Sequence, residues 1–183
     1  VSLTARERRL HLVRGQLRID VAHDRRRPLS VQAAGHEIVA TGTAFNVDLV
    51  GRAARISLIE GSVEVWRLTR GRREGDATAL EAGERIDVTP GTEGRRGRFE
   101  VSEATAWQRG RLEFNDERLA DAIARMNRYA RAPITADGAI ADLRITGVFD
   151  AGATDTFVEA ITSYLPVAAT TAPDGAVRLT RRS

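Results

Sequence analysis

The chain has 183 residues, of which 42% are hydrophobic and 29% are charged, and it contains no cysteine. This length is enough for one large domain or two small ones, and the composition is typical of a globular protein. The absence of cysteine excludes disulfide bonds, thiolate metal sites and a cysteine nucleophile. No apolar run approaches the ~20 residues that cross a bilayer. Because the chain begins at Val1, we expect it to be part of a longer protein.

The charges are nearly balanced, with 28 basic and 25 acidic residues and a net charge of +3. Every basic residue is arginine, and arginines are consecutive over three or more positions only at 25–27. A nucleic-acid interface usually shows a one-sided basic stripe and aromatic residues for base stacking. Aromatic residues make up only 5% of this chain. We therefore predict no nucleic-acid partner.

The first half of the chain has the period-two hydrophobic pattern of short strands. Turn-forming residues separate these runs, for example at Ala34-Gly35 and Glu60-Gly61. Residues 69–79 and 89–98 are rich in glycine and arginine, and we interpret them as a flexible hairpin and a linker. Many short strands without helical periodicity predict an all-β sandwich or roll over residues 1–98. The residues that carry the pattern are Leu10, Leu12, Leu17, Ile19, Val21, Val31, Ile38, Phe45, Val47, Ile56, Leu58, Val63, Val65, Ile86 and Val88.

Helical periodicity begins in the second half. Asn115 or Asp116 could cap a helix that begins at Glu117 and ends at Ala132-Pro133. A second helix is predicted from Thr154 to Tyr164. Short strands are expected at residues 111–114, 134–135, 143–149, 167–171 and 177–180. The resulting order predicts a small α+β domain of two β-α-β units over residues 99–183, so that the whole chain is mainly β plus α+β.

Several stretches in a fixed order resemble the FecR family. The most specific is Gly-Thr-x-Phe-x-Val at residues 42–47, followed by the Glu-Gly-x-Val-x-Val pair at 60–65. Residues 107–114 resemble the family's Trp-x-x-Gly-x-Leu-x-Phe junction. Residues 119–129 and 143–149 are similar to the short secretin/TonB amino-terminal type domain at the end of FecR proteins.

The resemblance implies a periplasmic, signal-receiving region of an anti-sigma regulator that crosses the inner membrane once. Its implied partner is the amino-terminal signalling domain of a TonB-dependent outer-membrane receptor, commonly one that imports iron chelates. The family controls an extracytoplasmic-function sigma factor through a cytoplasmic segment, which this sequence lacks. We therefore expect no direct contact of these residues with the sigma factor.

The resemblance also singles out Gly42-Thr43, because some FecR-type regulators cleave themselves at a Gly-Thr bond. In that reaction the threonine hydroxyl attacks the preceding carbonyl, and glycine permits the strained backbone that the attack needs. The alternative is that Gly42 forms a tight bend and Thr43 is an ordinary strand residue. Such a cleavage would happen once per molecule, so it would not make the protein an enzyme with turnover.

Other candidate sites have simpler interpretations. His11, His23 and His36 lack metal-ligand spacing, and we predict no metal site and no cofactor. The carboxylate pairs Asp20/Asp24 and Asp116/Glu117 are better explained by turns and helix capping than by acid–base catalysis. Trp107 is expected to pack where two domains meet rather than to bind a ligand.

The partner is expected to bind at a free strand edge of the carboxy-terminal domain. Candidate edges are residues 111–114 and 177–180, and the candidate residues are Arg111, Leu112, Phe114, Val177, Arg178 and Thr180. An alternative function is a carbohydrate or cell-envelope binding module, which would expose several aromatic side chains. A periplasmic enzyme is a further alternative, but the sequence contains no nucleophile–base set, phosphate loop or metal cluster.

Overall fold

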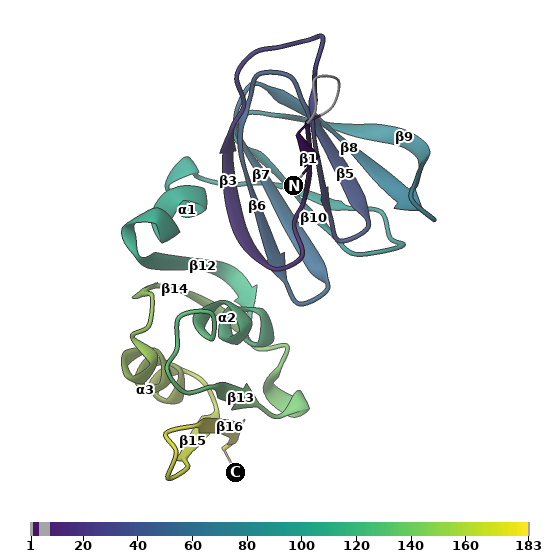
Figure 1. Cartoon of the computed structure of the whole chain (residues 1–183). Helices are drawn as coiled ribbons and strands as arrows, with labels where there is room; N and C mark the ends of the chain where they lie inside the picture. The colour runs from purple at the N-terminus through teal and green to yellow at the C-terminus, as the bar shows by residue number, and fades with distance from the viewer. Residues whose placement is uncertain (1, 4–7, 183) are drawn as a thin grey trace. The chain divides into compact units, whose positions relative to one another are not determined.

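The computed structural model describes residues 2–3 and 8–182, and the chain divides into two compact units, residues 1–104 and 105–183. The first unit is built mainly of strands, with most of the short helix α1 at its end, and the second is built of strands and helices (Figure 1). The predicted fold class, mainly β plus α+β, is therefore confirmed.

Two sheets form the first unit. One has the strand order β1-β2-β4-β5-β8-β9, and the other has the order β11-β10-β7-β6-β3. Neighbouring strands are antiparallel except β2 and β4, which are parallel. The strands are β1 (Ser2–Leu3), β2 (Arg8–His11), β3 (Gly15–Asp20), β4 (Leu29–Ala33), β5 (His36–Ala40), β6 (Ala44–Val50), β7 (Ala53–Glu60), β8 (Ser62–Thr69), β9 (Arg72–Glu81), β10 (Glu84–Val88) and β11 (Arg95–Arg98).

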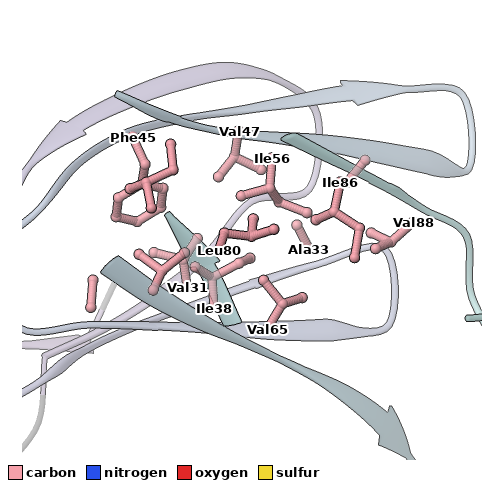
Figure 2. Close-up of a cluster of buried hydrophobic side chains, with 14 of the residues drawn as sticks. Val31, Ala33, Ile38, Phe45, Val47, Ile56, Val65, Leu80, Ile86 and Val88 are labelled. Atoms are coloured by element: carbon pink, nitrogen blue, oxygen red, sulfur yellow. The ribbon is translucent and has the colours of Figure 1, made fainter. Parts of the chain in front are cut away.

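The core of this unit lies between the two sheets (Figure 2). In one sheet Ile38 is paired with Val31 on one side and with Val65 on the other. In the other sheet Ile56 is paired with Val47 and with Ile86 in the same way. All six side chains are buried, so each sheet contributes a cross-strand apolar row to one core. This arrangement is the predicted β-sandwich.

The interpretation of the two glycine- and arginine-rich segments is wrong in part. Residues 72–81 form strand β9, and Arg70 and Gly71 make the two-residue turn before it, with φ values of 51° and 77°. Positive φ at both turn residues matches the strand twist of a tight hairpin. Residues 95–98 are no linker, because β11 pairs with β10 along residues 84–87. The Arg96 guanidinium also binds Glu84 at 2.9 Å, so pairing outweighs the entropic cost of glycine.

The second unit contains a two-stranded sheet, β12-β14, and a three-stranded sheet, β13-β16-β15. Strand β16 is parallel to β13 and antiparallel to β15. The predicted order of strands and helices agrees with the structure, and the second helix has the predicted bounds. The elements are α1 (Val101–Thr105), η1 (Ala106–Arg109), β12 (Arg111–Arg118), α2 (Leu119–Met126), β13 (Ile134–Ala136), η2 (Gly138–Ile140), β14 (Arg144–Asp150), α3 (Thr154–Tyr164), β15 (Val167–Thr171) and β16 (Val177–Arg181), of which α1 ends at the boundary between the units.

The predicted start of the first helix at Glu117 is wrong. Strand β12 continues through an irregularity at Asp116, whose φ is 47°, and Glu117 pairs with Ile145. Helix α2 therefore begins at Leu119. It ends at Met126, earlier than predicted, and the Asn127 side chain then hydrogen-bonds both the N–H and the C=O of Ile134 at 2.8 Å.

A second apolar core holds this unit together. At its centre the rings of Phe114, Phe149 and Phe157 lie with their centroids 5.1–5.9 Å apart. These rings come from β12, β14 and α3, so the core joins the two-stranded sheet to the second helix. Among the helices of the described residues, none has the length and apolar character needed to cross a membrane.

Candidate functional site

The Gly42–Thr43 peptide lies in the turn between β5 and β6, and the segment before β4 holds it in place. The N–H of Val21 donates to the C=O of Thr43 at 2.8 Å. The N–H of Asp24 donates to the C=O of Thr41 at 3.2 Å. Backbone hydrogen bonds therefore fix the chain on both sides of Gly42.

The backbone at Gly42 has a conformation and surroundings that require glycine. Its φ is 142°, and a Cβ atom there would lie 2.4 Å from Nδ1 of His23. Gly61, with a φ of 85°, approaches the same peptide. A Cβ at Gly61 would lie 2.8 Å from Cγ2 of Thr43 and 2.9 Å from the carbonyl oxygen of Gly42. Two further residues, His23 and Gly61, thus crowd this peptide.

Thr43 is 5% exposed, and its hydroxyl oxygen is buried without a hydrogen-bond partner among the described residues. A buried hydroxyl that lacks a partner is destabilising by about 1–3 kcal/mol. No hydrogen bond therefore competes with a reaction of this oxygen. The positive φ of Gly42 and the unpartnered hydroxyl of Thr43 are both compatible with an attack of this oxygen on the preceding carbonyl.

The peptide borders an open groove of about 520 Å³. The groove is lined by His23, Arg25, Thr41, Gly42, Thr43, Gly61, Ser62 and Glu81. The sequence motif identified only Gly42 and Thr43. His23 and Gly61 come from other segments, and no local sequence signal connects them to this turn.

The three histidines do not form a metal site in the structure. His36 is buried, and its Nδ1 lies 2.9 Å from the carbonyl oxygen of Ala34. His11 and His23 are exposed and lie on β2 and before β4, respectively. Within residues 2–3 and 8–182, no group of three or more potential ligands could hold a metal ion.

The two carboxylate pairs are occupied by structural contacts. Asp20 lies 3.2 Å from Arg18. Asp24 accepts a hydrogen bond from the Arg27 guanidinium at 2.9 Å, and this contact holds the pKa of Asp24 below its ordinary value. Glu117 is buried and lies 2.7 Å from the buried Arg125. Asp20, Asp24 and Glu117 are each bound by arginine, as expected of structural rather than catalytic groups.

The tryptophans do not form an exposed aromatic surface. Trp107 packs against the core of the second unit. Trp66 is half-buried, with the Arg73 guanidinium 4.9 Å from its ring centroid. Among the described residues of the two sheets and their loops, Val13 is the exposed large hydrophobic residue. This surface lacks the aromatic row that a carbohydrate-binding face would need.

One of the two predicted strand edges is wrong. Strand β16 lies between β13 and β15 and is paired on both sides. Val177 is buried, and Arg178 binds Asp137 at 2.9 Å. Because Thr180 pairs with Ala168 within the same sheet, residues 177–180 cannot offer a free edge to a partner strand.

The other predicted edge, β12, is covered in part. Leu112 and Phe114 are buried in the core, whereas Arg111 is exposed. Residue pairs along the β12–β14 ladder alternate between hydrogen-bonded and non-hydrogen-bonded pairs, and the bond from the N–H of Ala151 to the C=O of Gly110 shows which pairs are which. Glu113 belongs to a non-hydrogen-bonded pair, so its N–H and C=O point away from β14. Its carbonyl accepts a hydrogen bond from Arg125 at 3.0 Å instead.

Strand β14 offers the more open edge, which the sequence did not identify. Val148 pairs with Glu113, so its N–H and C=O also point away from the ladder. Its side chain is 46% exposed, and within the described residues β14 pairs with β12 alone. A pocket of about 150 Å³ lies beside β14, lined by Arg144, Ile145, Thr146, Phe149, Ala160, Ile161, Tyr164 and Leu165.

Comparison with known proteins gives matches at both the sequence and the fold level. Residues 1–64 match the family model described as FecR protein. Two crystal structures of a candidate anti-sigma factor from Parabacteroides distasonis, at 1.65 and 2.50 Å resolution, are similar in fold, each with a TM-score of 0.84 and 22% identity. Each match covers 100% of this chain and 84% of that chain. No curated protein matches the sequence.

The matched residues include the Gly-Thr-x-Phe-x-Val segment at 42–47 and the Glu-Gly-x-Val-x-Val segment up to residue 64, two of the segments on which the sequence resemblance depends. The solved structures extend the likeness in fold to both units of the chain. The resemblance of this chain to the FecR family is therefore confirmed, with residues 1–64 as the part that matches the family model.

Proposed function

We propose that the chain is the signal-receiving region of an anti-sigma regulator, located in the periplasm as part of an inner-membrane protein. The observation that carries the proposal is the FecR match in residues 1–64 together with a fold shared over the whole chain with a candidate anti-sigma factor. The proposed partner is the amino-terminal signalling domain of a TonB-dependent outer-membrane receptor, as the family resemblance implies. Another segment of the regulator would then control the sigma factor, and through it the genes for iron-chelate uptake.

The partner is proposed to add a strand to the free edge of β14. At this edge the backbone groups of Val148 point outward, and they could pair with an extended segment of the partner. The apolar pocket beside β14 would take an alternate side chain of that segment, since side chains of an added strand alternate between the two faces. Backbone pairing would supply affinity, and the pocket would supply specificity.

A proline scan of the two outer edges tests this proposal. Val148→Pro removes the outward N–H, and the pairing of β14 with β12 does not use that N–H. Val148→Ala keeps the N–H and is the matched control. Glu113→Pro makes the equivalent change on the β12 edge. Binding to the purified receptor domain is measured by isothermal titration calorimetry, and circular dichroism checks that each variant is folded.

We expect Val148→Pro to weaken binding at least tenfold, Val148→Ala to bind within threefold of the unchanged chain, and Glu113→Pro to have the smaller effect of the two prolines. If a folded Val148→Pro protein bound as tightly as the unchanged chain, the β14 edge would be excluded as the binding site. Failure of the unchanged chain to bind the cognate receptor domain would argue against the proposed partner itself.

A second proposed activity is self-cleavage at Gly42–Thr43, supported by the strained glycine and the unpartnered hydroxyl. The Thr43 hydroxyl oxygen would bond to the carbonyl carbon of Gly42 while the peptide C–N bond breaks, and the hydroxyl proton would move to the nitrogen. Water would then hydrolyse the resulting ester. The products are a carboxylate at Gly42 and a fragment that begins with Thr43.

Incubation of the purified chain, followed by mass spectrometry, tests this activity. Thr43→Val replaces the hydroxyl with a methyl group of similar shape, and Thr43→Ser keeps the hydroxyl. We expect the unchanged chain and Thr43→Ser to produce the fragment that starts at position 43, and Thr43→Val to stay intact. An unchanged chain that stays intact on prolonged incubation would leave Gly42 and Thr43 with a structural role alone.

A further inference from the structure

We infer that His23 is the base that activates water for the second step of cleavage at Gly42–Thr43. This inference rests on the self-cleavage proposed above, and it adds a residue that the sequence motif does not contain. The contact that supports it is the approach of His23 to the scissile peptide. Nδ1 of the ring lies so close to Gly42 that a Cβ atom there would be 2.4 Å from it.

Access to water distinguishes His23 from Thr43. The hydroxyl oxygen of Thr43 is buried, so the first step takes place away from solvent. The His23 side chain is exposed and lines the open groove beside the same peptide. A water molecule in this groove would reach the carbonyl carbon of Gly42 next to an imidazole nitrogen that can accept its proton.

The charged groups near His23 are few. Arg25 and Glu81 line the groove, and Asp24, the next residue, is bound by Arg27. Arginine does not act as a base at ordinary pH, so Glu81 is the other proton acceptor among the described residues that line the groove. Glu81→Gln therefore provides a control for an alternative base in the same place.

The proposed step balances as follows. The water oxygen bonds to the carbonyl carbon of Gly42, and the bond from that carbon to the Thr43 hydroxyl oxygen breaks. One water proton passes to His23 and then to the departing Thr43 oxygen. The whole cleavage consumes one water molecule, needs no oxidant or reductant, and leaves His23 unchanged.

Ester trapping tests the inference. Hydroxylamine cleaves an ester, and this sequence contains no Asn-Gly bond that hydroxylamine would also attack. The variants are His23→Ala, His23→Gln and Glu81→Gln, with His11→Ala as a control at an exposed histidine on β2. Cleavage is followed with and without hydroxylamine, and free imidazole is added to the His23→Ala protein.

Loss of a general base slows a step by about 10²-fold or more, so we expect spontaneous cleavage of both His23 variants to slow by that factor. The ester should accumulate, hydroxylamine should release both fragments, and imidazole should restore cleavage of His23→Ala. His11→Ala and Glu81→Gln should cleave like the unchanged chain. Rescue by imidazole separates a proton-transfer role from a purely structural role of the ring.

Cleavage of His23→Ala at the unchanged rate would overturn the inference and leave the self-cleavage proposal standing. Slow cleavage without ester that hydroxylamine can trap would also overturn it, because His23 would then act before ester formation or through the fold. An unchanged chain that stays intact with and without hydroxylamine would overturn both proposals together.

Discussion

Two glycines, Gly42 and Gly61, allow the backbones of two turns to approach each other in the sandwich. Gly42 follows β5 and Gly61 connects β7 to β8, so the contact joins segments that are distant in the sequence. The two family motifs contain Gly42 and Gly61, but the close approach of these two glycines appears only in three dimensions. Long-range packing of this kind leaves no periodicity in a single sequence.

Gly61→Ala tests this contact by stability. The added Cβ would meet Thr43 and the carbonyl of Gly42 at under 3.0 Å, and the φ of 85° is unfavourable for alanine. Gly51→Ala is the matched control, because Gly51 has a φ of 60° but nothing within 4 Å of its Cβ position. We expect about 1–2 kcal/mol of destabilisation for Gly51→Ala from the backbone alone, and a clearly larger loss for Gly61→Ala in urea unfolding. Equal losses would mean that the turns move apart freely.

Glu37 gives a prediction on acid stability. Burial raises the pKa of Glu37, but hydrogen bonds from Ser30 and Arg73 outweigh burial and hold the pKa below its ordinary value of 4.5. A lowered pKa in the folded state contributes stability that is present above pH 4.5 and lost as the pH falls through the folded pKa. Chemical unfolding at pH 7 and pH 3 should therefore show a smaller acid loss for Glu37→Gln than for the unchanged chain. The exposed Glu93→Gln is the control, and an acid loss in Glu37→Gln equal to that of the unchanged chain would contradict the account.

At the scale of elements, hydrophobic periodicity predicts which residues form a strand or a helix, but it does not predict which strands pair with each other. The apolar alternation identified β2 to β8 and β10, and the helix at 154–164 was placed correctly. Strands β9 and β11 were missed because β11 and the first half of β9 are made mainly of Arg, Glu and Gly, and these residues are stabilised by pairing with a neighbouring strand. The edge at 177–180 was wrong because its parallel partner, β13, pairs with it across 43 residues of sequence, which periodicity does not reveal.

The two helices of the second unit should tolerate little change on their buried faces. Ile123 of α2 is 5% exposed and Phe157 of α3 is fully buried. We expect Ile123→Ala to destabilise by about 2–5 kcal/mol and Phe157→Ala by about 3–5 kcal/mol, because each leaves a cavity. Tyr164→Ala, on α3 and 88% exposed, is the control, with an expected change within about 0.5 kcal/mol. Equilibrium denaturation measures all three, and a change near zero for Phe157→Ala would contradict the described core.

At the scale of the whole molecule, the sequence predicts a domain boundary between residues 98 and 99. The structure divides the chain into two compact units, residues 1–104 and 105–183. Each unit has its own apolar core, which is what independent folding requires. The segment between β11 and α1 joins the sandwich to the rest of the chain and is open to a protease. Its exposed Glu100 lies outside any helix or strand.

Limited digestion with a glutamate-specific protease tests this division. We expect the first cut at Glu100, with fragments 1–100 and 101–183 that both resist further digestion and unfold cooperatively on heating. The unfolded chain, digested in parallel, controls for the intrinsic preference of the protease. A first cut at Glu60, the last residue of β7, would mean that the sandwich opens before the connection does.

Hydrogen exchange of the chain, with and without the purified signalling domain of the proposed partner, a TonB-dependent receptor, tests the central claim most directly. The claim is that the chain receives its signal through the free edge of β14, where Val148 points its backbone outward. The account predicts that the receptor domain slows exchange over residues 144–150, with the largest effect at the Val148 amide. Exchange that slows only within residues 8–98, or at no residue, would contradict it.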